Sequence, residues 1–317
     1  MMEGLRYGIC STSSIAPRFI AAVREGKAGE ITAVSSRTLE KAREKATEWN
    51  IPYAYGSHVE LFRDKNVNTV YVSSVNSEHY GMVKTALEYG KNVVCEKPCT
   101  VSSEQTEELF RIAGEKGLFL MEAQKMLFLP VINEVAKRIK EGFIGDVKFV
   151  DFSHSFSAGY NDWLFDPALG GGTLLSAGIY AIQFLISFFG DIKNVKGVCV
   201  NDEGLAEKGY VISGVTENGV MFCAKNSTDT AFENKAVIYG TSGKIEIPEY
   251  WKARQAFILV DGREKEEIKY PCKYELIYEA KHIAECIEKG LTESPVVTKE
   301  ISLKGIRAIE RIKSAWE

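Results

Sequence analysis

The chain has 317 residues, enough for about two domains of roughly 150 residues each. Its composition, with 45% hydrophobic and 26% charged residues, is that of a globular protein and excludes a disordered, collagen-like or coiled-coil chain. The 39 Lys and Arg residues against 43 Asp and Glu residues give a net charge of −4, so the balance indicates neither nucleic acid nor an anionic membrane as a partner.

The first part of the chain, residues 1–122, alternates apolar runs with segments of helical spacing. We expect buried strands at 5–10, 31–35, 67–73, 92–95 and 118–121, and helices at 15–24, 39–49, 79–89, after Ser57, and from Ser102 to Gly117. This alternation predicts βαβ units and a parallel sheet, with a ligand site at the carboxyl ends of the strands. Residues 1–122 are therefore predicted to form a dinucleotide-binding Rossmann domain.

The pattern changes in residues 123–317. A helix at 130–141 and a strand at 147–156 precede a glycine-rich helix at 173–189. Further strands are expected at 193–200, 208–216, 219–225, 234–239, 244–247 and 255–260, with helices at 275–289 and 299–316. Clustered strands with helices to one side predict an α+β domain on a largely antiparallel sheet.

Residues 167–190 contain no charged side chain and are long enough to cross a bilayer. The glycine triplet 170–172 and several polar residues dilute this stretch, which favours a helix buried inside a protein. The polar N-terminus does not fit a signal peptide, and the 7 cysteines lack C-x-x-C spacing. We expect a cytoplasmic protein with free thiols and, since the 4 histidines lack ligand spacing, no metal site.

The segment Cys95-Glu96-Lys97-Pro98 follows a predicted strand, where parallel sheets carry their chemistry. The segments at 76–80, 120–123, 166–175 and 178–180 accompany it. Together these motifs resemble the Gfo/Idh/MocA oxidoreductase family over nearly the whole chain, most closely its dihydrodiol dehydrogenase-like branch. The resemblance implies that Lys97 is catalytic; taken alone, the residue would be read as a surface lysine in a loop.

The loop after the first strand departs from the phosphate-binding pattern. The three glycines of G-x-G-x-x-G would fall on Ser11, Ser13 and Ala16. Hydroxyls and helix N-terminal amides can still hold a pyrophosphate, so we expect cofactor contacts from Ser11, Thr12, Ser13, Ser14 and Ile15. The alternative is a cofactor site that has been lost.

The end of the second strand bears on the choice of cofactor. It carries Ser36 and Arg37, with Lys41 one helical turn beyond, and no acid before Glu40. An acid here would hold the ribose of NAD, whereas an arginine accommodates the 2′-phosphate of NADP. These residues favour NADP, although Arg37 could also be a solvated residue at a helix start. The resemblance adds Ser74, Asn76, His79, Glu96 and Lys97 to the cofactor site; His79 could equally have a structural role.

The resemblance assigns acid/base catalysis to Tyr180. Tyrosine ordinarily has a pKa of ~10, and a nearby ammonium, expected to be that of Lys97, would stabilise the phenolate. The family aspartate is Ser176 here, one helical turn before Tyr180. Without the resemblance, Tyr180 would be read as a core aromatic residue. Substrate contacts are expected from Gln124, Trp163, Ser176 and Tyr180, within segments that also carry Lys125, Tyr160, Asn161 and Phe165.

The sequence therefore predicts an enzyme, an NAD(P)-dependent dehydrogenase or reductase that prefers NADP. It would transfer a hydride between nicotinamide C4 and a secondary alcohol or carbonyl of a sugar, polyol or dihydrodiol. The replaced glycines and Ser176 leave open a catalytically weak, NADP-binding regulatory protein as the alternative. By resemblance, the chain is also expected to be a homodimer or higher homo-oligomer.

Overall fold

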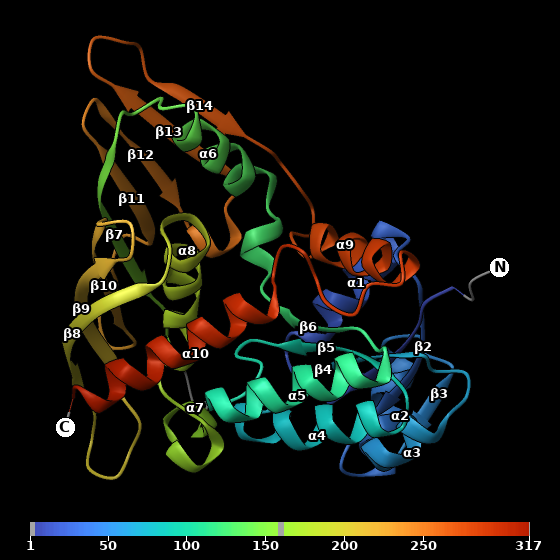
Figure 1. Cartoon of the computed structure of the whole chain (residues 1–317). Helices are drawn as coiled ribbons and strands as arrows, with labels where there is room; N and C mark the ends of the chain where they lie inside the picture. Colours follow the sequence, from blue (N-terminus) through green and yellow to red (C-terminus); the bar gives the residue numbers. More distant parts are fainter. Residues whose placement is uncertain (1–3, 158–161, 317) are drawn as a thin grey trace. The chain divides into compact units, whose positions relative to one another are not determined.

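A computed structural model describes residues 4–157 and 162–316 of the chain (Figure 1). They form two compact units: the first contains the chain up to Gln124 together with Tyr274–Ser302, and the second contains Lys125–Lys273 and the chain from Leu303 onward. The predicted division after residue 122 treated each domain as one continuous segment. The return of residues 274–302 to the first unit was not predicted.

The first unit is built on a six-stranded parallel sheet with the order β3-β2-β1-β4-β5-β6. Its strands are β1 (Arg6–Cys10), β2 (Glu30–Ser35), β3 (Tyr53–Tyr55), β4 (Thr69–Val72), β5 (Asn92–Glu96) and β6 (Leu120–Ala123). This is the doubly wound order of a Rossmann domain, and the strand order reverses between β1 and β4. The predicted fold class is confirmed. Only β3, three partly exposed residues long, was missed in this sheet.

The helices of the first unit begin and end where local signals place them. They are α1 (Ala16–Gly26), α2 (Leu39–Glu48), α3 (His58–Arg63), α4 (Asn76–Glu88), α5 (Ser103–Lys116) and α9 (Ile277–Glu288). Ser57 and Ser102 cap α3 and α5 by accepting the amide hydrogens of Glu60 and Gln105, each at 3.2 Å. Gly117 ends α5 in the left-handed conformation, as a C-cap glycine does.

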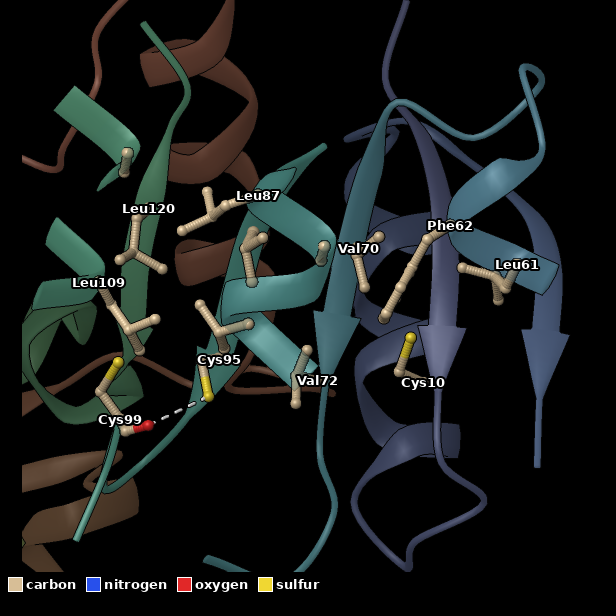
Figure 2. Close-up of a cluster of buried hydrophobic side chains, with 14 of the residues drawn as sticks. Cys10, Leu61, Phe62, Val70, Val72, Leu87, Cys95, Cys99, Leu109 and Leu120 are labelled. Carbon is tan, nitrogen blue, oxygen red and sulfur yellow. Dashed lines mark hydrogen bonds between the residues drawn. The ribbon is translucent and has the colours of Figure 1, made fainter. Parts of the chain in front are cut away.

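Both faces of this sheet are covered. On one face, residues of α3, α4 and α5 pack with Cys10, Val70, Val72 and Cys95 in the apolar cluster of Figure 2. On the other face, the ring of Phe19 in α1 stacks on Tyr71 with centroids 3.8 Å apart. Helix α9 packs beside α1 (Figure 1), and Thr292 accepts the amide hydrogen of Leu120 in β6. These contacts explain why residues 274–302 belong to the first unit.

The second unit is built on an eight-stranded sheet with the order β14-β13-β12-β11-β7-β10-β9-β8. Its strands are β7 (Val147–Ser155), β8 (Ile192–Val200), β9 (Gly209–Thr216), β10 (Met221–Ser227), β11 (Lys235–Gly240), β12 (Gly243–Pro248), β13 (Gln255–Val260) and β14 (Glu266–Lys269). The β7–β10 pair is parallel and the other pairs are antiparallel, which confirms the largely antiparallel prediction. The four-residue strand β14 was missed.

The remaining helical segments are η1 (Lys125–Phe128), α6 (Pro130–Lys140), α7 (Asp162–Phe165), η2 (Pro167–Leu169), the π-helix η3 (Leu174–Gly178), α8 (Ile179–Phe189), η4 (Tyr250–Lys252) and α10 (Lys299–Ser314). By length and composition, Pro167–Phe189 could span a membrane, but 83% of its apolar window is buried inside the structure. Phe184 of α8 packs edge-on against Phe152 of β7, with ring centroids 5.5 Å apart. The segment is therefore a core helix of this unit, as expected.

Candidate active site

The loop between β1 and α1 keeps a glycine-like backbone although its glycines are replaced. Ser11 stands at the first glycine position with a φ of 99°, in the region that ordinarily favours glycine. The hydroxyl of Ser13 donates to the hydroxyl of Ser73 at 2.9 Å, which ties the loop to the end of β4. Within the described residues, the N-cap Ile15 makes no side-chain bond to α1. In the first turn of α1, the amides of Ala16 and Arg18 already donate to the carbonyls of Ser13 and Ile15, and Pro17 has no amide hydrogen, so contacts to an anion fall to the loop before the helix.

The end of β2 presents a guanidinium to solvent. Ser36 is buried and its amide donates to the carbonyl of Tyr55, while Arg37 is exposed. Arg37 forms no ion pair with any residue in the described part of the chain. Lys41 is also exposed, but its ammonium pairs with Glu44 at 2.9 Å. Of the two cations expected near the cofactor ribose, Arg37 is thus the one better able to bind a phosphate.

The end of β4 leads into α4, whose first residue is the buried Asn76. His79, 1% exposed, places one ring nitrogen 2.9 Å from the carbonyl oxygen of Pro98 and the other 3.0 Å from that of Ser74. Burial lowers the pKa of His79, and these two hydrogen bonds oppose that shift. The imidazole joins the loops after β4 and β5, so the structural role left open by the sequence is the one that this geometry supports.

The end of β5 carries the predicted catalytic lysine. Glu96 accepts a hydrogen bond from the hydroxyl of Tyr71 at 2.5 Å and another from the amide of Lys97. Glu122 of β6 is 1% exposed and accepts the amide hydrogen of Cys99 at 3.1 Å. Burial lowers the pKa of Lys97, while the charges of Glu96 and Glu122 oppose the shift. The pKa of Lys97 therefore lies below that of an ordinary lysine, although two nearby carboxylates favour the charged form.

These strand ends fit a dinucleotide. The edge at which β1, β2, β4 and β5 end carries hydroxyls and an exposed arginine, groups that bind a pyrophosphate and a ribose phosphate. The left-handed backbone at Ser11 lets the chain turn as a glycine would. In the described part of the chain, no group of three or more His, Cys, Asp or Glu side chains could hold a metal ion.

The predicted acid/base residue lies in the second unit, in the first turn of α8. Tyr180 is 6% exposed, and its hydroxyl oxygen accepts a hydrogen bond from the ammonium of Lys125 at 2.7 Å. The same ammonium lies 4.9 Å from the centroid of the Tyr180 ring. The sequence predicted a lysine beside this tyrosine but pointed to Lys97. The lysine that contacts Tyr180 within its own unit is Lys125.

The other predicted substrate residues are distributed over several segments. Gln124 follows β6 at the end of the first unit and is fully buried. Its backbone amide donates to the backbone carbonyl of Glu122. Trp163 is half-buried in α7, and Ser176 lies in the π-helix, where its hydroxyl donates to the carbonyl of Thr173 at 3.4 Å. Tyr160 and Asn161 lie outside the described residues.

A polar row on the inner face of the second sheet was not predicted. Asn226 of β10 lies directly between His154 of β7 and Tyr210 of β9. Its amide is 3% exposed, and neither amide atom has a hydrogen-bond partner among the described groups. A methyl group on Gly178 would lie 2.7 Å from the Tyr210 hydroxyl, so this row reaches the start of α8. The alternating pattern of β7 places His154 on the same face as Phe152, but the register that sets His154 beside Asn226 cannot be read from a sequence.

Comparisons with known proteins agree with this arrangement. Residues 5–124 match the oxidoreductase family with an NAD-binding Rossmann fold, and residues 132–246 match the Gfo/Idh/MocA C-terminal domain. The chain is 33% identical over 314 residues to trans-1,2-dihydrobenzene-1,2-diol dehydrogenase of Xenopus tropicalis, with 92% of each protein covered. It is 31% identical over 325 residues to the Sus scrofa enzyme of the same name, covering 98% of this chain and 96% of the relative.

Solved structures share the fold. An aldose-aldose oxidoreductase from Caulobacter crescentus has a TM-score of 0.89 at 25% identity, over 99% of this chain and 98% of that one. A 3-ketoreductase from Actinomadura kijaniata has a TM-score of 0.90 at 24% identity, with the same coverage. These relatives are named as enzymes, and none favours the regulatory alternative. The chain therefore belongs to the Gfo/Idh/MocA oxidoreductase family and is an NAD(P)-dependent oxidoreductase that acts on hydroxyl or carbonyl groups.

Proposed function

We propose that the enzyme prefers NADP and interconverts a secondary alcohol and its carbonyl in a small diol, polyol or sugar. The observation that carries the cofactor preference is Arg37, an exposed guanidinium without an ion pair in the described part of the chain, just beyond β2. The substrate class is supported by the relatives, which are named as dihydrodiol dehydrogenases and an aldose-aldose oxidoreductase.

Separate groups of residues bind the cofactor and carry out proton transfer. The loop Ser11–Ile15, with the hydroxyls of Ser11, Thr12, Ser13 and Ser14, binds the pyrophosphate, and Arg37 binds the 2′-phosphate. When bound, the nicotinamide accepts or returns the hydride. Tyr180 takes the hydroxyl proton of the alcohol during oxidation and returns it to the carbonyl oxygen during reduction. Lys97, whose charged form is favoured by Glu96 and Glu122, orients the reacting oxygen and stabilises the negative charge that develops on it.

The cofactor preference is tested by fluorescence titration of the enzyme with NADPH and, separately, NADH. Replacing Arg37 by Ala should weaken NADPH binding about 10-fold or more, since a charge-assisted contact to phosphate contributes roughly 1.5–3 kcal/mol, and should leave NADH binding almost unchanged. The matched control is Arg43→Ala, which removes another exposed arginine of α2. Equal affinity of the wild-type enzyme for NADPH and NADH would refute the preference.

The same proposal extends to the assembly and the compartment. Val198, Val211 and Met221 are 68%, 47% and 54% exposed on the outer face of the second sheet, where an apolar surface favours association between copies. The 7 free cysteines suit a reducing cytoplasm. Light scattering on the purified enzyme tests for a homo-oligomer, and a monomer at micromolar concentration would exclude one.

A further inference from the structure

A buried ion–phenol pair joins η1 to α8 in the second unit. Lys125 is 7% exposed, and its ammonium donates to the Tyr180 hydroxyl oxygen at 2.7 Å while lying 4.9 Å from the ring centroid. A desolvated ammonium is costly unless a partner compensates for its lost water. The oxygen and the electron-rich face of Tyr180 both contribute to that compensation. The contact is therefore built into the interior of the unit rather than being a chance surface encounter.

The hydrogen-bond direction constrains the chemistry. Lys125 has only donors, so the Tyr180 oxygen is the acceptor in this contact. The phenol O–H is then directed away from Lys125. An ammonium that donates to a phenol oxygen favours the phenolate over the phenol, because the negative charge is attracted to it and receives its hydrogen bond.

Tyr250, Tyr210, Glu207 and His154 are further titratable groups in this part of the second unit. Burial raises the pKa of Tyr250 in η4, and Tyr210 and Tyr180 add to that shift, so Tyr250 stays protonated. Burial and the charge of Glu207 likewise raise the pKa of Tyr210. Glu207 lies at the start of the π-helix, where it accepts the amide hydrogen of Leu174. His154 approaches Tyr250 from β7, with ring centroids 6.3 Å apart.

We propose that Lys125 is a positioning residue that stabilises the phenolate of Tyr180 and so sets the pH at which the enzyme exchanges the substrate proton. The inference rests on the acid/base role proposed for Tyr180. During oxidation, the O–H bond of the alcohol would break and an O–H bond would form on the phenolate of Tyr180, while a bound nicotinamide would serve as the acceptor for the hydride of the C–H bond. Lys125 stays protonated throughout and donates to the same oxygen in both directions.

The direct test measures the ionisation of Tyr180. The chain has 14 tyrosines, so the absorbance of tyrosinate must be assigned to one of them. The wild type and each Lys125 variant are therefore titrated with and without the additional substitution Tyr180→Phe, and the difference between the two curves reports Tyr180. Lys125→Met should move the midpoint of this difference upward by about 1–3 pH units, the usual influence of an adjacent opposite charge. Lys125→Arg, which keeps the charge, should restore the midpoint.

Two further variants separate charge from packing. Lys125→Gln keeps a hydrogen-bond donor without the charge, so its midpoint should lie between those of the wild type and Lys125→Met. Lys244→Met removes a lysine of β12 that pairs with Glu246, and should leave the Tyr180 midpoint unchanged. A midpoint in Lys125→Met within 0.3 pH units of the wild type, a margin of about 0.4 kcal/mol, would overturn the proposal.

Kinetics then connect the pair to turnover. In the oxidation direction, the limb of the kcat profile that reports Tyr180 should move upward in Lys125→Met by the same interval as the tyrosinate midpoint. A tyrosinate shift without a shift of the rate profile would refute the control of turnover by Lys125. If Tyr180→Phe turns over normally, the proposed role of Tyr180 fails, yet the absorbance titration still decides whether Lys125 controls its ionisation.

Discussion

Replacing Lys97 by Met should lower the activity of the enzyme without lowering its stability. In the fold, burial makes the Lys97 ammonium less favourable than in the unfolded chain, and Glu96 and Glu122 offset this cost only in part. Both carboxylates keep other donors when the ammonium is removed, because Glu96 is bonded to Tyr71 and Glu122 to the amide of Cys99. We expect turnover to fall about 10²–10⁴-fold, the usual contribution of a proton-transfer or charge-stabilising group.

The stability of the same variant should not fall. At neutral pH, Lys97→Met should unfold with a free energy equal to that of the wild type or higher by about 0.5–2 kcal/mol, the usual gain when a strained functional group is removed. The folded-state pKa of Lys97 is depressed, so between that value and the unfolded value the unfolded chain binds more protons than the folded one. Wild-type stability therefore recovers as the pH rises through this window, and the advantage of the variant shrinks.

Urea denaturation at neutral and alkaline pH measures both effects, with steady-state assays on the same samples. Lys97→Arg serves as the control, because it keeps a buried cation and should gain no stability. Destabilisation of Lys97→Met by more than about 1 kcal/mol at neutral pH, or an advantage that grows with pH, would refute the reasoning.

Three further predictions concern the supports of the site. Ser11→Gly should raise the free energy of unfolding by about 1 kcal/mol, because it relieves a left-handed backbone, whereas Ser11→Ala should give no gain; equal melting temperatures would contradict this. His79→Leu should lower the free energy of unfolding by about 1–3 kcal/mol, because a buried carbonyl loses its hydrogen-bond donor. Because a buried neutral histidine destabilises the fold as the pH falls below about 6.5, the variant should also lose less stability in that range than the wild type. An unchanged dependence of stability on acid pH would contradict this. Gly172→Ala places a methyl group 2.4 Å from Glu207 Oε1 and should lower both melting temperature and turnover, whereas Gly81→Ala, with open space around it, should lower neither.

Much of the candidate site could be predicted because it follows from local signals and topology. The carboxyl ends of parallel strands meet at one edge of a sheet, so the loops after β1, β2, β4 and β5 were placed together before any coordinate was known. Helix ends at Ser57, Ser102 and Gly117 depend on neighbouring residues alone. The assignments of Lys97 and Tyr180 came from a family resemblance, and they remain predictions for the experiments above.

The sequence by itself determined the order and type of most elements, the Rossmann topology and the groups at the strand ends, since periodicity, caps and turns act over a few residues. Only the tertiary structure decided that α9 packs beside α1, that the two ring nitrogens of His79 face two loop carbonyls, and that the ammonium of Lys125 donates to the hydroxyl of Tyr180, 55 residues away. An amphipathic helix shows that it has a buried face but not which sheet buries it. Likewise, the sequence does not show which oxygen will accept a hydrogen bond from a lysine that loses its water on burial.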